Sequence, residues 1–167
     1  LGADDENTQQ NAAMVLSDMT RISKEHAATV EQQGGIPLLV TLLVESEKVE
    51  IKAHASDVLG SIAIEHALQV GSSGAITPLV ELLKKESNHA RKKAARALAH
   101  IAAGGENNQN MVEDAGGVEL LVGLLKPDHG RDEEVQSMAA GALAALAREN
   151  KSNQSAITKC GGIEPLI

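Results

Sequence analysis

The sequence predicts an all-α protein built from stacked helical repeats. Short phrases recur along the chain at intervals of about forty residues, a length typical of helical repeat proteins. Within one of these phrases, apolar residues are spaced three and four positions apart, as on one face of a helix. Phe, Tyr and Trp are absent, so the core must consist of smaller residues. A core of Ala, Leu, Ile, Val and Met suits closely packed helices.

The first recurring phrase begins at a glycine corner and continues as a short apolar helix. It reads GGIPLLVTLL from Gly34, GAITPLVELL from Gly74, GGVELLVGLL from Gly116 and GGIEPLI from Gly161. Its aligned positions Ile36, Ile76, Val118 and Ile163 are 40, 42 and 45 residues apart. The glycines suit a turn with positive φ or a close backbone approach. Pro37, Pro78 and Pro165 fall in the first helical turn, where a missing N–H costs little.

The second phrase predicts a longer helix. It reads AAMVLSDMT from Ala12, ASDVLGSIA from Ala55, AARALAHIA from Ala94 and AAGALAALA from Ala139. Its leucines and the apolar residues three positions later define the buried face. Ser46, Ser87 and Asp132 precede three of these helices, and we expect them to be N-caps.

The third phrase predicts a short helix before each glycine corner. It reads HAATVEQQ from His26, HALQVGSS from His66, NQNMVEDA from Asn108 and NQSAITKC from Asn153. Each unit is therefore a short helix, a corner, a second helix, a loop and a longer third helix. The link between Ala63 and His66 is three residues shorter than the corresponding link between Ala102 and Asn108. The loop at 126–132, which includes Pro127, carries extra residues instead, as expected of variation confined to loops.

This three-helix unit resembles the armadillo repeat of β-catenin, importin-α and the vacuolar armadillo tether. HEAT repeats are the nearest alternative, but they use two helices and usually lack the short helix before the corner. The resemblance covers residues 1–167 as a single array. It comprises partial repeats at 1–23 and 150–167 and complete repeats at 24–64, 65–103 and 104–149. It implies a right-handed α-solenoid whose third helices line a concave groove, and in the family that groove binds extended segments of partner proteins.

The groove positions differ from those of importin-α-like proteins. In those members a Trp, and an Asn four residues later, stand on each third helix and hold a basic peptide. The corresponding Trp positions here are Met14, Asp57, Arg96 and Gly141, and the Asn positions are Asp18, Ser61, His100 and Ala145. Neither residue type is retained, so cation–π slots for lysine stems are missing. The resemblance therefore does not extend to nuclear-import receptor activity.

The candidate partner-binding residues lie on the expected third helices. They are Asp18, His54, Asp57, Ser61, Lys93, Arg96, His100, Met138 and Gly141. We expect Lys93, Arg96 and His100 to bind a carboxylate-bearing segment, with Asp57 or Asp18 taking a basic side chain further along. The alternative interpretation is that these charges are solvated helix faces. Gly141 costs about 1 kcal/mol relative to Ala in a helix, and it either permits close approach of a partner backbone or reflects sequence drift.

Composition and motifs argue against several other functions. A net charge of −8 and a pI near 5.2 disfavour nucleic acid and anionic membranes, and there are no rings to stack on bases. No apolar run approaches the ~20 residues that a membrane span requires. His26 and His66 recur one repeat apart, which places them in a ladder rather than a four-ligand cage. Metalloprotease, EF-hand and phosphate-loop motifs are also absent. We therefore expect no catalysis, cofactor, metal or small-molecule substrate.

The sequence predicts a protein–protein interaction scaffold. The alternatives are a structural spacer or assembly segment of a larger protein, or the regulatory arm of an enzyme. The chain lacks an initiator Met and stops within an apolar phrase, so we interpret it as a piece of a longer protein. We expect apolar residues near both ends, Leu1 and Ile167 among them, to promote self-association. Cys160 is the single cysteine, which favours an intracellular location, cytoplasmic with nuclear as the alternative.

Overall fold

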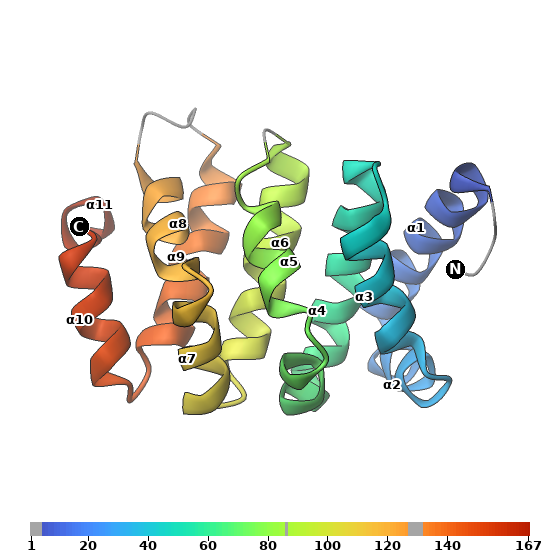
Figure 1. Cartoon of the computed structure of the whole chain (residues 1–167), viewed down its shortest axis with the longest axis horizontal. Helices are drawn as coiled ribbons and strands as arrows, with labels where there is room; N and C mark the ends of the chain where they lie inside the picture. The colour runs from blue at the N-terminus through green and yellow to red at the C-terminus, as the bar shows by residue number, and fades with distance from the viewer. Residues whose placement is uncertain (1–4, 86, 127–131) are drawn as a thin grey trace.

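The computed structural model describes residues 5–85, 87–126 and 132–167, and within these ranges every regular element is an α-helix. The helices are α1 (Glu6–Ile22), α2 (Lys24–Gln32), α3 (Gly35–Glu45), α4 (Val49–Ser72), α5 (Ile76–Leu82), α6 (Asn88–Ala102), α7 (Glu106–Asp114), α8 (Gly117–Leu125), α9 (Glu133–Ala147), α10 (Lys151–Lys159) and α11 (Ile163–Leu166). They stack side by side in a row that runs from α1 to α10 and α11 (Figure 1). The predicted all-α solenoid is confirmed.

The long third helices form one layer of the stack. α1 packs on α4, α4 on α6 and α6 on α9. The second helices α5 and α8 lie in front of α6 and α9 in the view of Figure 1. Successive units therefore contact their neighbours through equivalent helices, which is the arrangement of a solenoid.

The two glycines of a corner have different roles. Gly34 and Gly116 adopt left-handed backbone angles, with φ of 72° and 80°. Gly35 has an ordinary φ, but a Cβ atom there would lie 2.5 Å from Cγ1 of Val30. The first glycine of the corner is thus required by backbone geometry and the second by space, as the sequence predicted.

The structure differs from the prediction where one unit meets the next near residue 66. α4 continues through the predicted link and serves as both a third helix and the following first helix. Only His66 departs from helical geometry, with φ of −124° and ψ of 40°. At the next two junctions Gly105 and Glu149 have positive φ, of 116° and 58°, and break the helix. The shorter link leaves no residues for such a turn, so the chain bends within the helix.

Two of the three predicted caps are confirmed. The Ser87 side chain accepts a hydrogen bond from the backbone N–H of Ala90, and Asp132 caps α9 in the same way. Ser46 does not cap α4. Its hydroxyl instead accepts from the backbone N–H of Lys48, at 3.2 Å, and the helix begins only at Val49. Pro127, in the predicted loop, lies outside the described residues.

Large aliphatic and small residues alternate in the core between the third helices. Leu59 and Ile62 of α4, and Leu98 and Ile101 of α6, are fully buried. Each such side chain contributes about 1.5–3 kcal/mol to folding through burial. Small residues let the helices approach: a Cβ atom on Gly60 would lie 3.0 Å from the Cα of Ala97.

Among the described residues no single helix has the length and hydropathy to cross a membrane. α2 and α3 meet those criteria only as a pair, and they are bent by 88° relative to each other.

Candidate functional site: the third-helix face

We use the term third-helix face for the surface formed by α1, α4, α6 and α9. Positions 39 residues apart occupy equivalent places on α4 and α6, so they lie side by side across the helix contact. This register pairs Asp57 with Arg96, and Ser61 with His100. Eight of the nine predicted groove residues lie on α4, α6 or α9, and Asp18 lies on α1.

Asp57 is a buried structural residue rather than a groove ligand. Its side chain is fully buried and accepts hydrogen bonds from three groups: Ser17 Oγ at 2.7 Å, Lys93 Nζ at 2.9 Å, and Arg96 Nη2. The carboxylate therefore joins α1, α4 and α6. The prediction that Asp57 binds a basic side chain of a partner is wrong, because its own chain supplies the cations and excludes solvent.

Ser61 and His100 are engaged with the backbone of α4. The buried Ser61 hydroxyl donates to the carbonyl of Asp57 at 3.0 Å. Nδ1 of His100 lies 2.7 Å from the carbonyl oxygen of Gly60. The expectation that Ser61 contacts a partner is wrong because its side chain is buried, whereas His100 stays half-buried.

Asp18 stands apart from the other candidates. Its carboxylate is exposed and pairs with Arg21 of the same helix at 3.0 Å. An exposed pair of this kind contributes little to stability, so Asp18 remains available to a partner.

A hollow of about 460 Å³ lies on the surface where α6 and α9 meet. It is lined by His89, Lys92, Lys93, Arg96, Glu133, Glu134, Ser137 and Met138. The structure thus brings together three of the predicted residues, Lys93, Arg96 and Met138. Gly141 follows Met138 by one helical turn and is exposed, and apart from its chain neighbours and the nearby backbone of α9 no atom lies within 4 Å of the place a Cβ would occupy.

The hollow is mixed in charge rather than strongly basic. Lys93 and Arg96 together carry two positive charges, of which Asp57 balances one. Lys92 pairs with Glu134 across the hollow. One net positive charge therefore remains at the floor, and Glu133 adds an exposed negative charge at the rim.

Comparison with known proteins identifies the family. Residues 65–103 and 106–148 match the family described as the armadillo/beta-catenin-like repeat. A crystal structure of an engineered protein is 35% identical to this chain, with a TM-score of 0.89, and the match covers 100% of this chain and 69% of that one. This chain belongs to the armadillo-repeat family.

Two other similar structures are designed armadillo repeat proteins. One, described as a designed armadillo repeat protein, is 30% identical with a TM-score of 0.88, over 99% of this chain and 69% of its own. The other was solved in complex with the peptide (KR)4 and is 28% identical with a TM-score of 0.86, also over 99% and 69%.

Sequence reasoning missed several residues that line this armadillo surface. Lys92, Glu133, Glu134 and Ser137 border the hollow, although none was selected from the sequence. The signal was available in the register, because Glu134 occupies on α9 the place that His89 has on α6. From the sequence alone, charged residues at these positions are indistinguishable from the solvated residues of an ordinary helix end. Only the position of the neighbouring helix shows that they line a hollow.

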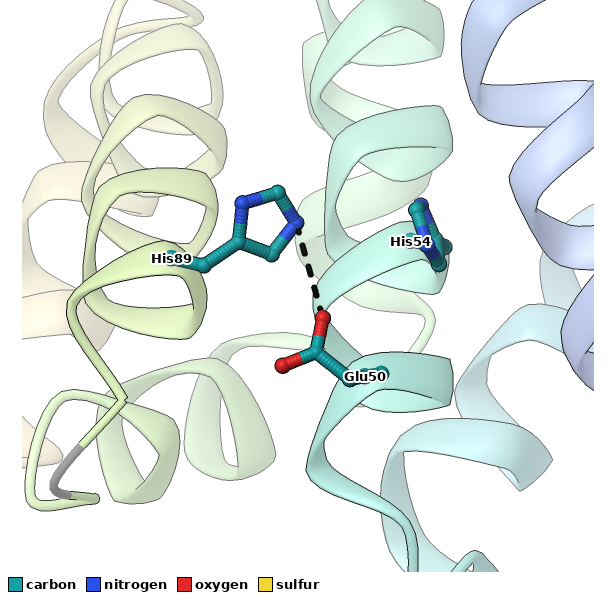
Figure 2. Close-up of side chains that lie close together, drawn as sticks. All are labelled: Glu50, His54 and His89. Carbon is teal, nitrogen blue, oxygen red and sulfur yellow. Dashed lines mark ion pairs between the residues drawn. The ribbon is translucent and has the colours of Figure 1, made fainter.

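His54 belongs to a different cluster from the one expected. It lies near Glu50 of its own helix and His89 of α6 (Figure 2). Glu50 Oε2 is 3.9 Å from His89 Nε2, and the two imidazole rings have centroids 5.8 Å apart. Burial is the main cause that lowers the pKa of His54, and the nearby His89 adds to it. His54 is therefore neutral at pH 7.

A second hollow, of about 680 Å³, lies beside the bend in α4. Its wall includes His66 and His100, together with the exposed side chains of Ile64 and Leu68.

Proposed function

We propose that this armadillo array is a non-enzymatic scaffold that binds an extended segment of a partner protein along the third-helix face. The observation that carries the proposal is the hollow between α6 and α9, together with the exposed Gly141 one helical turn beyond Met138. An extended segment crossing from α6 to α9 would pass over Lys93, Arg96, Met138 and Gly141. We place its action inside the cell, because its one cysteine is a free thiol.

The peptide-binding role is supported by relatives of the same fold. One designed relative was solved with a bound peptide, and another group of designs is described as intended for modular peptide recognition. Those descriptions concern the designed proteins. For this chain they support a general peptide-binding role. The charge of the bound segment is inferred from the residues of this chain alone.

We further propose that the bound segment carries a carboxylate near Lys93 and Arg96. These side chains are about a quarter exposed, at 21% and 26%, and they exceed the charge of Asp57 by one unit. The Lys92–Glu134 pair is more exposed at its carboxylate and can separate when a partner binds.

Charge reversal at Arg96 is a poor test of this proposal, because it would leave Asp57 buried beside a second negative charge. Gly141 offers a cleaner site, since a new side chain there meets open space. Gly141→Glu and Gly141→Lys differ in charge but are matched in size and helix propensity, and Gly141→Ala is the neutral control.

The assay is fluorescence anisotropy with two labelled peptides of equal length, one rich in Asp and Glu and one of alternating Lys and Arg. One unit charge at about 8 Å and an effective dielectric constant near 40 is worth ~1 kcal/mol, or about fivefold in affinity. We expect the acidic peptide to bind Gly141→Lys about fivefold more tightly, and Gly141→Glu about fivefold more weakly, than Gly141→Ala. The opposite order of affinities would show that the face binds a basic segment. Equal affinities for all three variants would show that the peptide does not bind at the third-helix face near Gly141.

A second candidate function is end-to-end assembly. A hollow of about 270 Å³ beside α9, α10 and α11 is lined mainly by apolar side chains, including Leu143, Ile157, Ile163 and Leu166. Ile163 and Leu166 are about half exposed. Apolar surface of this kind favours packing against another repeat, either in the same polypeptide or in a second copy.

A further inference from the structure

Three potential metal ligands converge where α4 and α6 run side by side. Glu50 and His54 come from α4 and His89 from α6, and one ligand atom from each lies within 4.8 Å of the other two. Figure 2 shows the Glu50 carboxylate below the two imidazole rings, with a dashed line that joins one of its oxygens to the His89 ring. The closest pair is Glu50 Oε2 and His89 Nε2, at 3.9 Å.

The repeat architecture explains this convergence. Glu50 and His54 are four residues apart, so both lie on one face of α4. His89 follows Glu50 by 39 residues, the same offset that pairs Asp57 with Arg96, and it therefore occupies the equivalent place on α6. The cluster is thus held by two rigid, mutually packed helices rather than by a loop.

The donor set is one that suits transition metals. Two imidazole nitrogens and one carboxylate oxygen match the ligands of three-residue zinc sites, which keep a further position open. The buried Nδ1 of His54 has no hydrogen-bond partner among the described residues, which leaves one ring nitrogen unsatisfied.

We propose that Glu50, His54 and His89 bind a divalent transition cation, with Zn²⁺ the best match, and that the ion links two adjacent repeats. Zinc bonds of 2.0–2.2 Å require ligand atoms about 3.3–3.6 Å apart, so the side chains must close by roughly 1 Å. Glu50 and His89 are about half exposed at their side chains and are free to rotate. Lys93 lies close enough to act on His54, and the single negative charge of Asp57, shared between Lys93 and Arg96, offsets only part of the positive charge near the ion.

His89 belongs both to this cluster and to the lining of the proposed peptide groove, but the Zn²⁺ titration contains no peptide, so either proposal can fail alone. Isothermal titration of the chelator-treated chain with ZnCl₂ tests it directly. We expect one equivalent to bind with about micromolar affinity, weaker than four-ligand structural sites. Thermal melting gives a second readout: at a hundredfold excess over Kd, Zn²⁺ should raise Tm by about 5–10 °C.

The variants are His89→Ala, His54→Ala and Glu50→Gln, with His26→Ala as the control. His26 is an exposed histidine on α2, away from the cluster. At the same Zn²⁺ concentration each ligand variant should weaken Zn²⁺ binding at least about tenfold and reduce the Tm increase to about half or less, whereas His26→Ala should match the parent. Because His89 is half-buried and has little packing to lose, His89→Ala keeps the test valid if His54→Ala lowers stability.

Two results would overturn the proposal. One is the absence of saturable 1:1 binding by the parent chain. The other is equal Zn²⁺ affinity in the parent and in His89→Ala, which would move the ion to other ligands such as Cys160.

Discussion

Asp57 provides the sharpest test of how the third helices are held together. The perturbation is the pair of substitutions Lys93→Met and Arg96→Met, singly and combined. Each keeps the length of the aliphatic stem and removes one cation from a carboxylate that is fully buried. Ser17 Oγ, at 2.7 Å, is then the remaining side-chain donor to that carboxylate in the double variant.

The expected losses follow from the number of partners that remain. Removing one charged partner leaves the other, so each single variant should lose about 1.5–3 kcal/mol of unfolding free energy. Removing both leaves an uncompensated buried charge, for which a loss of about 3–5 kcal/mol is typical. The partial exposure of Lys93 and Arg96, at 21% and 26%, places both figures toward their lower ends.

The assay is urea denaturation followed by circular dichroism at pH 7, with the slope m compared across variants to check that the transition remains cooperative. Adding Asp57→Asn to the double variant removes the buried charge and should recover at least half of the loss. The reasoning is refuted if the double variant lies within about 0.5 kcal/mol of the parent, the range of ordinary surface substitutions. It is equally refuted if Asp57→Asn makes the double variant less stable.

The remaining predictions concern glycine, a buried amide and the apolar end. Gly141→Ala should raise the free energy of unfolding by about 1 kcal/mol, whereas Gly116→Ala, at φ of 80°, should lower it by about 1–2 kcal/mol. Thermal melting should therefore show Tm shifts of opposite sign for the two variants, and shifts of the same sign would contradict the prediction. The Nδ2 of Asn108 donates to two backbone carbonyls at 2.8 and 2.9 Å, so Asn108→Ala should cost about 2–3 kcal/mol in urea denaturation. Asn107→Ala, at an exposed neighbour, should change stability by less than about 0.5 kcal/mol, and equal effects of the two would argue against the hydrogen bonds. If the apolar end mediates self-association, Leu166→Glu should shift light scattering from dimer toward monomer; a parent chain that is monomeric at high concentration excludes that association.

The helical units were predictable because their signals are local. The glycine corners encode a positive φ, as Gly34 and Gly116 show, and the cap residues Ser87 and Asp132 act within three residues of their own position. The prediction that Ser46 is an N-cap was wrong because a serine near the start of a helix can instead accept a hydrogen bond within the turn that precedes the helix. The bend at His66 was not predicted because a short segment between two helices can form either a tight turn or a continuation of the helix.

The site was less predictable because its chemistry depends on neighbouring helices. Asp57 and Arg96 each read as a polar residue on an amphipathic helix, and their mutual neutralisation appears only once α4 is placed against α6. The 39-residue register could have predicted that contact, since it sets opposite charges side by side. The same register aligns Glu50 with His89, a pairing that is not apparent from the histidines His26 and His66, which recur at equivalent positions of successive repeats.

The central claim is that a partner segment lies along the third-helix face, and methionine methyl NMR tests it most directly. The chain has four methionines, of which Met138 lines the hollow between α6 and α9, while Met111 lies on the first helix α7. Titration with the Asp- and Glu-rich peptide should shift or broaden the Met138 methyl signal and leave that of Met111 unchanged. A shift at Met111 with Met138 unaffected would contradict the account and place binding on another surface of the array.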